Sequence, residues 1–280
     1  MTDSLPELSV IVASRDRADS LARCLAALNE SWAATQMAWE VIVVDNASTD
    51  ATSAVVREFA ARAAYPVTLL QESRPGVSRA RNAGAATARS DWLAFTDDDC
   101  LVDPQWPTAL LAAVAERPGL GLIGGRVDLA DPLDLPASTR SFSDAMDIND
   151  LDALTARMIG CNFAMRADLF QALGGFDPRL GGGTPALAAE DFDLFYRALH
   201  QGAAMRYEPS ARLRHAHGRR GETQGRQLTQ AYIRGRGAFL AKHSLRGDGL
   251  MFRRFYWELA KPGGGRMRLL QGFFGRLIGR

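Results

Sequence analysis

The sequence predicts an α/β fold with a mainly parallel central sheet. In the first half of the chain, short apolar runs alternate with segments whose apolar residues recur at helical spacing. This alternation is typical of β-α-β units, whose right-handed connections place parallel strands side by side. The apolar runs are nearly continuous, as expected of strands that are covered on both faces. The chain has 280 residues, of which 47% are hydrophobic, so it can build one large domain of this class.

The first half is expected to contain four strands joined by three helices. The strands are predicted at residues 8–13, 41–44, 67–70 and 92–97. The helices are predicted around residues 21–28, 52–59 and 77–88. Each helix has room to cross over the sheet and return the chain to the next parallel strand.

The second half is less regular. Further strands are predicted at residues 119–127, 158–165, 205–209 and 211–214, and helices at residues 166–173 and 190–200. Residues 128–157 contain several Asp, Pro and Ser residues and are expected to be loop with some helix. We therefore expect a main domain at residues 1–218 and a basic amphipathic helical tail at residues 219–280.

Charge is distributed unevenly along the chain. The net charge of +1 argues against nucleic acid as the main partner. Residues 219–280 nevertheless contain 14 basic and 3 acidic residues, so the tail is basic and the body is acidic. Residues 266–280 have the pattern of a short basic amphipathic helix, which could lie on an anionic membrane surface. Packing of this segment on the domain, or on a second copy in a homo-oligomer, is the open alternative.

Composition also predicts where the protein resides. The three cysteines are far apart in the sequence and form no CxxC pair, which favours a reducing cytosol. No window approaches 18 uninterrupted apolar residues, and the N-terminus lacks the pattern of a signal peptide. We expect a cytoplasmic protein, with a peripheral position on the inner face of the plasma membrane if the tail binds lipid.

The most informative motif is the run of three acids at the end of the predicted strand 92–97. Asp97, Asp98 and Asp99 repel one another, and without a cation one of them would tend to take up a proton. Hard divalent cations prefer such oxygen ligands. The end of a strand in an α/β sheet is also where such folds bind ligands. A solvated acidic turn is the alternative for the motif taken by itself.

Several motifs occur in a fixed order through residues 8–217. They are Ser9–Val12 followed by Ser14–Arg17, then Glu40–Asp50, Gly76–Gly84, the three acids, Gly174–Asp177, Glu190–Asp191 and His215. As a set they make the chain similar to family 2 glycosyltransferases of the GT-A fold, a Rossmann-like α/β/α sandwich. The resemblance implies a nucleotide-binding half at residues 8–127 and an acceptor-binding half at residues 128–218. Residues 219–280 match only loosely.

The resemblance implies an inverting, divalent-metal-dependent transfer of a sugar from a nucleotide diphosphate donor, with a UDP-sugar favoured. The acceptor would be a hydroxyl of a glycan or a lipid-linked glycan, in cell-envelope or polysaccharide biosynthesis. Such a reaction must stabilise a departing diphosphate, which a metal ion can do as a Lewis acid.

The acids of the triad then receive different roles. In similar enzymes the last acid, here Asp99, binds the metal, and the first, Asp97, lies near the nucleotide ribose. The middle acid, Asp98, could serve either. Related enzymes place a metal-binding histidine after a short strand, and His215 is our assignment, with His217 as the fallback. Mn²⁺ or Mg²⁺ is the expected ion.

Three further donor contacts are expected at the ends of the first two predicted strands. By analogy with the family, Asp45 would bind the nucleotide base or ribose, and an Asx-type turn is a second role for the same residue. Ser14 and Arg17 would flank the base and ribose. For Arg17, a surface charge with no ligand is the alternative.

Arg79 and Asn82 lie one helical turn apart, at i and i+3. We expect them to share a face near the donor or the acidic cluster, with Arg81 pointing elsewhere. Pairing of Arg79 with a carboxylate of the acid triad is the alternative.

The acid pair Glu190–Asp191 opens a predicted helix. Acids at this position also favour the helix dipole, which is a purely structural reason for their presence. In the family that the chain resembles, the second residue of this pair is the catalytic base, here Asp191. The base takes a proton from the acceptor hydroxyl as it attacks the anomeric carbon. Glu190 would orient the base or bind the acceptor.

Three other functions compete with this prediction. A dinucleotide-dependent oxidoreductase would need a glycine fingerprint after the first strand, and none is present there. A sugar-1-phosphate nucleotidyltransferase would need a phosphate loop rich in Gly and Lys, but no lysine precedes Lys242. A catalytically silent nucleotide-sugar-binding protein is the third, and the presence of both acid motifs speaks against it.

Overall fold

The computed structural model of the protein describes residues 5–260 and residue 270. The strands in this part are β1 (Leu8–Ser14), β2 (Trp39–Asp45), β3 (Val67–Gln71), β4 (Trp92–Asp97), β5 (Cys100–Val102), β6 (Leu120–Leu129), β7 (Met146–Asp147), β8 (Asn162–Arg166) and β9 (Ala204–His215). The helices are α1 (Ala18–Thr35), α2 (Thr52–Ala60), α3 (Val77–Thr87), α4 (Trp106–Glu116), α5 (Leu151–Arg157), α6 (Ala167–Ala172), α7 (Glu190–His200), α8 (Glu222–Ser244) and α9 (Gly249–Ala260).

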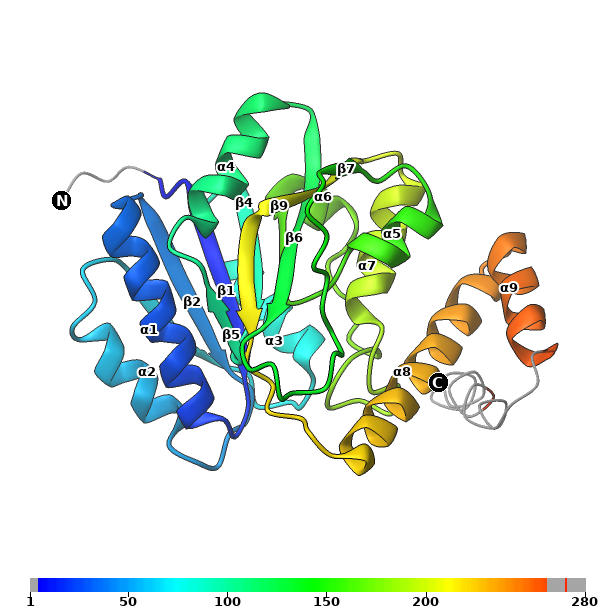
Figure 1. Cartoon of the computed structure of the whole chain (residues 1–280), viewed down its shortest axis with the longest axis horizontal. Helices are drawn as coiled ribbons and strands as arrows, with labels where there is room; N and C mark the ends of the chain where they lie inside the picture. The colour runs from blue at the N-terminus through cyan, green and yellow to red at the C-terminus, as the bar shows by residue number, and fades with distance from the viewer. Residues whose placement is uncertain (1–4, 261–269, 271–280) are drawn as a thin grey trace.

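The strands form one central sheet with helices on both faces (Figure 1). Its order is β3-β2-β1-β4-β8-β6-β9-β5, and β7 pairs with β9. The first four strands of this order are parallel to one another. β8 then runs antiparallel to both β4 and β6. The predicted α/β class with a mostly parallel central sheet is confirmed, and each antiparallel pair includes a strand from the second half of the chain, β7, β8 or β9.

Alternate residues of each central strand face opposite helix layers. In β1, Val10 belongs to the core cluster that contains Leu25 of α1, whereas Ile11 belongs to the cluster that contains Leu194 of α7. Both faces of β1 are buried except at Ala13, which is partly exposed, and this explains why the strand is a continuous apolar run. The layer on the second face includes α3, which lies close to the sheet at Gly84. A Cβ atom at Gly84 would lie 2.7 Å from Ile11 Cγ2, so a larger residue would push this helix away from the sheet.

Two predicted strand boundaries in the second half differ from the structure. The strand expected at residues 158–165 begins only at Asn162, because the residues before it form a turn toward α7. The two strands expected at 205–209 and 211–214 are one strand, β9. Its pairing with β6 shifts register between Gly125 and Arg126, opposite the segment that contains Pro209. Proline cannot donate to the ladder, which explains both the irregularity and the interrupted sequence pattern.

Helices α8 and α9 pack on the domain rather than forming a separate tail. Phe239, Leu240 and Met251 are buried in the same core cluster as the residues of α7. Within the described part of the predicted tail, residues 222–244 and 249–260 are helical, and they are joined to the core. Residues 266–280, predicted to bind a membrane, lie outside the described residues apart from Leu270. Among the helices that the structure describes, none combines the length and apolar character that crossing a membrane requires.

A buried ionic network joins α7 to α8. Asp193 of α7 is fully buried and accepts hydrogen bonds from Lys242 Nζ at 2.7 Å and His243 Nε2 at 2.9 Å. It also accepts one from Arg197 Nε at 2.9 Å. Lys242 Nζ lies 2.9 Å from Asp177 Oδ2 as well. A buried charge of this kind stays charged only while its partners are present, so the network fixes α8 against α7.

We predict that Lys242→Met lowers the free energy of unfolding by about 3 kcal/mol, because it leaves two buried carboxylates with one cation fewer. Arg226→Met is the matched control on the same helix. Arg226 pairs with Glu222 at the exposed surface, at 3.3 Å, where such pairs contribute less than about 1 kcal/mol. Urea unfolding of both variants measures the difference. Equal effects would mean that the buried network does not hold α8.

Candidate functional site

The carboxyl ends of β1 and β4 open onto a cavity of about 750 Å³. Its lining continues past the start of α7 to the side chains of α8 and α9. Eight of the eleven residues predicted to form the site line this cavity. They are Ser14, Arg17, Asp97, Asp98, Asp99, Glu190, Asp191 and His215. Residues far apart in the sequence therefore meet in one place, as expected where parallel strands end at a common edge.

The acid triad is surrounded by hydrogen-bond donors and cations. Ser14 Oγ donates to Asp98 Oδ2 at 2.7 Å. Arg17 Nη1 donates to Asp98 Oδ1 at 3.1 Å and to Asp99 Oδ2 at 2.6 Å. Burial raises the pKa of Asp98 to about 6, although the charge of Arg17 acts in the opposite direction. The charge of Asp99 raises this pKa further, so the expected repulsion between the acids is present, and Arg17 offsets part of it.

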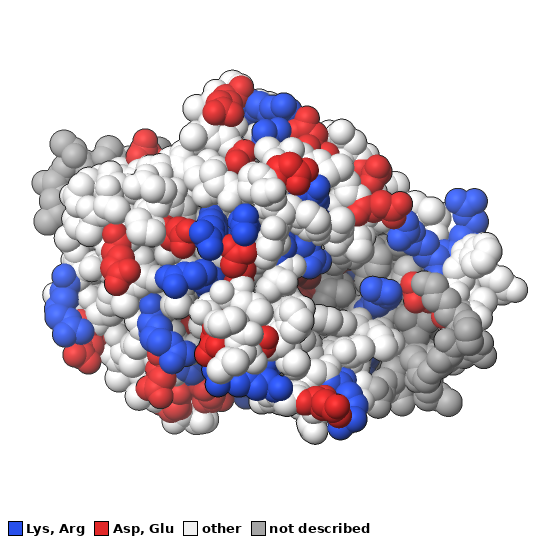
Figure 2. Space-filling model, viewed as in Figure 1, with Lys and Arg blue, Asp and Glu red and all other residues white. Residues whose placement is uncertain are grey.

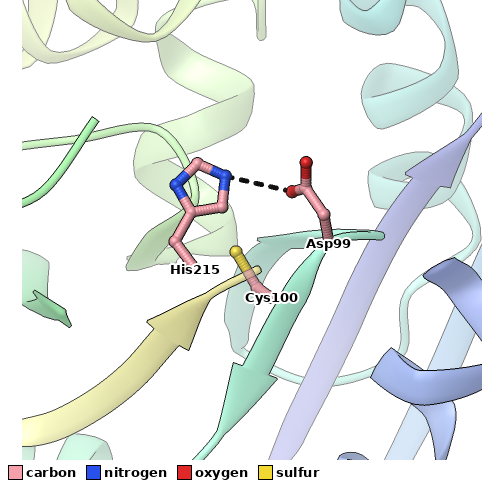
Figure 3. Close-up of side chains that lie close together, drawn as sticks. All are labelled: Asp99, Cys100 and His215. Atoms are coloured by element: carbon pink, nitrogen blue, oxygen red, sulfur yellow. Dashed lines mark hydrogen bonds and ion pairs between the residues drawn. The ribbon is translucent and has the colours of Figure 1, made fainter. Parts of the chain in front are cut away.

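The last acid of the triad, Asp99, also contacts His215 (Figure 3). His215 Nε2 lies 3.1 Å from Asp99 Oδ1, and both side chains are buried. The pairing of β5 with β9 brings them together, because Cys100 lies directly opposite His215 in the ladder. Burial disfavours the charged carboxylate of Asp99 and the charged imidazolium of His215. The hydrogen bond between the two groups, together with the neighbouring charges, outweighs this effect of burial. The pKa of Asp99 lies well below its usual range, and that of His215 is raised to about 9.

This pair fits a divalent cation. Adjacent ligand atoms of an octahedral ion bound at ~2.1 Å lie ~3.0 Å apart, close to the observed 3.1 Å between Asp99 Oδ1 and His215 Nε2. His215 Nδ1 faces the carbonyl oxygen of Ser138 at 3.2 Å. A hydrogen on Nδ1 would be donated there, so that a metal ion which displaces the proton from Nε2 would find its lone pair available. The carboxylate suits Mn²⁺ or Mg²⁺, and the imidazole favours Mn²⁺ of the two, because Mg²⁺ prefers oxygen ligands.

The fallback ligand, His217, is placed differently. Its Nδ1 accepts a hydrogen bond from the backbone N–H of Arg219 at 3.0 Å and lies 3.7 Å from Asp134 Oδ2. Its ring lies edge-on to that of His215, with the centroids 5.0 Å apart. His217 is not part of the cavity lining, so its position favours His215 as the ligand.

Arg81 links the acid triad to the acid pair at the start of α7. Its side chain is 3% exposed. Nη2 donates to Asp97 Oδ1 at 2.5 Å, and Nη1 donates to Glu190 Oε1 at 3.0 Å. The prediction that Arg81 points elsewhere is therefore wrong. The arginine joins two acid motifs that are separated by more than ninety residues in the sequence.

The acid pair begins α7 directly after Ala189, whose φ of 76° turns the chain into the helix. Burial raises the pKa of Glu190 to about 7, and the neighbouring Asp191 acts in the same direction, whereas Arg81 opposes it. Asp191 Oδ1 accepts a hydrogen bond from the backbone N–H of Phe192 at 2.7 Å. This contact uses one oxygen of Asp191, and the residue lines the cavity.

Three predicted donor-binding residues do not line the cavity. Asp45 accepts a hydrogen bond from the N–H of Ser48 at 2.9 Å and another from the hydroxyl of Ser53. It therefore makes the turn that was its second predicted role. The amide of Asn82 exchanges two hydrogen bonds of 2.9 Å with the backbone of Phe176, and Arg79 also lies outside the lining.

The face of α3 that reaches the cavity is therefore not the one that carries Arg79 and Asn82. The buried positions of α3 are Ser78, Ala80, Arg81 and Gly84, and three of them, Ser78, Arg81 and Gly84, are spaced three residues apart. Sequence reasoning favoured Arg79 and Asn82 for the same spacing. Gly84 carried a usable signal, because a glycine inside an Ala-rich helix often marks the side that approaches a sheet. The residues on its face would then have included Arg81.

Comparisons with known proteins agree with this geometry. Residues 9–174 match the model of glycosyl transferase family 2. The glycosyltransferase AglE of Haloferax volcanii is 29% identical over 182 residues, which is 64% of this chain and 59% of that protein. The succinoglycan biosynthesis protein ExoO of Rhizobium meliloti is 30% identical over 219 residues, which is 75% of this chain and 60% of that protein. The chain thus spans about 60% of the length of these relatives.

A solved structure shows the same fold. It is the mannosyltransferase PcManGT from Pyrobaculum calidifontis in complex with GDP-Man and Mn²⁺. The TM-score is 0.62 at 21% identity, over 99% of this chain and 71% of that one. The fold is the GT-A fold that the motifs imply. Since the family model also covers more than half of its residues, the chain belongs to glycosyl transferase family 2.

Proposed function

We propose that the protein transfers a sugar from a nucleotide diphosphate donor to an acceptor hydroxyl, with inversion and with the help of a divalent cation. One observation carries this proposal. Two groups of carboxylates, at the end of β4 and the start of α7, line one cavity and are bridged by Arg81. One group can serve the departing diphosphate while the other serves the acceptor proton.

The donor end is proposed at the carboxyl edge of the sheet. Asp99 and His215 would hold Mn²⁺ or Mg²⁺, which supplies Lewis-acid stabilisation of the leaving diphosphate when bound. Asp97 and Asp98 would face the nucleotide. Ser14 and Arg17 lie against the acids and would contact the nucleotide from the end of β1. We propose a UDP-sugar as the first candidate donor, and the GDP-Man bound to the similar PcManGT makes GDP the second.

The acceptor end is proposed at the start of α7. Asp191 would take the proton from the acceptor hydroxyl, and Glu190, held by Arg81, would orient the acceptor. Inversion follows if the hydroxyl attacks from the side opposite the leaving diphosphate. The acceptor is proposed to be a glycan or a lipid-linked glycan, and the similarity to a succinoglycan biosynthesis protein supports a role in polysaccharide assembly.

Gly160 supports the position of the proposed base. A Cβ atom at this residue would lie 2.4 Å from Asp191 Oδ2 and 2.7 Å from Asp191 Cβ. Such contacts are far inside van der Waals distance, so the carboxylate occupies space that only glycine leaves free. Gly160 would therefore be a positioning residue for the base.

The donor proposal is tested by thermal shift with a panel of nucleoside diphosphates, with and without Mn²⁺. A ligand at about 100 times its Kd should add about 2.7 kcal/mol of stability. In Asp99→Ala, the Mn²⁺-dependent part of the shift should disappear. Asp91→Ala, an exposed acid just before the opposite end of β4, is the control and should keep it. A Mn²⁺-dependent shift that survives in Asp99→Ala would contradict the metal assignment.

For the base, we predict that Asp191→Asn lowers kcat for release of nucleoside diphosphate by about 10²- to 10⁴-fold, because general-base catalysis contributes that much. The nucleotide thermal shift should be unchanged. Asp91→Asn, at the exposed acid just before β4 and outside the cavity lining, should retain wild-type turnover. Near-normal kcat in the Asp191 variant would exclude it as the base.

For the positioning role, we predict that Gly160→Ala lowers kcat by about 10²-fold, because a displacement of about 1 Å at a reacting group costs that much. Gly182→Ala is the matched control. Gly182 also lines the cavity, but its added Cβ would meet no atom within 4 Å. Both variants should keep the nucleotide shift. Equal kcat values in the two variants would show that Asp191 does not depend on Gly160.

A further inference from the structure

The cavity extends beyond the proposed reaction centre into a part that no donor contact uses. This part, called the apolar arm here, is lined by Leu151 of α5, the following Met158, Leu228, Phe239 and Leu240 of α8, and Met251 of α9. It begins next to the base, because Phe192 follows Asp191 and its ring lies 5.0 Å from that of Phe239. The apolar arm is therefore continuous with the acceptor end of the cavity.

The charged residues near the apolar arm are mostly neutralised by partners. Arg254 donates to Asp152 at 2.9 Å, and Arg236 donates to Glu258 at 3.3 Å. These pairs join α9 to α5 and to α8 across the cavity. Because these charges are paired, the apolar walls are the main feature that can recognise a ligand in this region. A ligand group that binds here leaves water and contacts hydrocarbon side chains.

We propose that the acceptor is an amphiphile, whose sugar hydroxyl reaches Asp191 while its apolar chain lies in the apolar arm between α5, α8 and α9. The proposal rests on the function proposed above, because it takes the start of α7 as the acceptor end. It narrows the acceptor to a glycan that carries a hydrocarbon group. Helices α8 and α9 then act as part of the acceptor site, which explains why a buried ionic network fixes α8 against the helix that carries the base.

The experiment uses a ladder of propyl, hexyl and octyl β-D-glucosides below their micelle concentrations, with the full chain, Mn²⁺ and a nucleoside diphosphate. Isothermal titration gives Kd for each. Binding of the chain in the arm should tighten Kd by about fourfold for each methylene group buried. A Kd that is independent of chain length would overturn the proposal.

Two substitutions at Leu228, a half-buried residue of the arm, locate the binding site. In Leu228→Arg, Kd should tighten by less than twofold for each methylene group that is added to the glucoside. Leu228→Trp, which fills the arm without adding charge, should weaken octyl glucoside more than propyl glucoside. Leu250→Arg is the control, because Leu250 is 41% exposed on α9 and outside the lining. The proposal would be overturned if Kd no longer depended on chain length in Leu250→Arg, or if it still did so as in the wild type in both Leu228 variants.

The two proposals fail in distinguishable ways. If the protein binds the nucleotide but the Kd of the glucosides does not depend on chain length, the apolar arm is rejected and the transferase function is not. If Kd tightens with chain length but the protein binds no nucleoside diphosphate, an apolar site is supported and the acceptor role assigned to it is rejected. The nucleotide shift also shows that the Leu228 variants are folded.

Discussion

The architecture of the site depends on keeping buried carboxylates charged at one edge of the sheet. Three adjacent acids at the end of β4 would repel one another and take up protons unless cations surrounded them. Each cation comes from a different element: Arg17 precedes α1, Arg81 lies in α3, and His215 ends β9. The acid cluster therefore fixes where those elements sit relative to β4. Among the described residues, acidic and basic side chains are also interspersed over the face seen in Figure 2.

Helix α7 is held from two sides by charge. At its start, Arg81 binds Glu190 and ties the helix to the acid triad. Two residues after Asp191, Asp193 points into the protein and is bound by Lys242 of α8. The base that we propose therefore sits on an element with little freedom to shift, as preorganised catalysis requires. The same contacts make the C-terminal helices a wall of the cavity.

The two ends of the cavity differ in character because they are built from different layers. The end at the sheet edge is polar, since parallel strands leave loops and helix starts there. The end beyond α7 is lined by helix faces, which present apolar side chains. A donor with a charged diphosphate and an acceptor with a hydrocarbon group are matched to these two ends. The single arginine between the carboxylate groups couples them.

The sequence by itself determined the fold class, the order of the motifs and most of the predicted residues that line the cavity. Apolar periodicity located β1, β2 and β4, and the bounds predicted for the base helix, 190–200, are those of α7. Eight of the eleven predicted residues share one cavity, because motifs at strand ends and helix starts must converge at the sheet edge.

Only the tertiary structure decided which helix face serves the site. Arg79 and Asn82 have the same spacing as Arg81 and Gly84. The packing of α3 on the sheet determines that Arg81 and Gly84 are the buried pair. It also decided that Lys242 reaches Asp193 and that Gly160 makes room for Asp191. Local sequence sets periodicity and chain direction, whereas the partners of a buried charge and the space around a side chain depend on elements far away in the sequence.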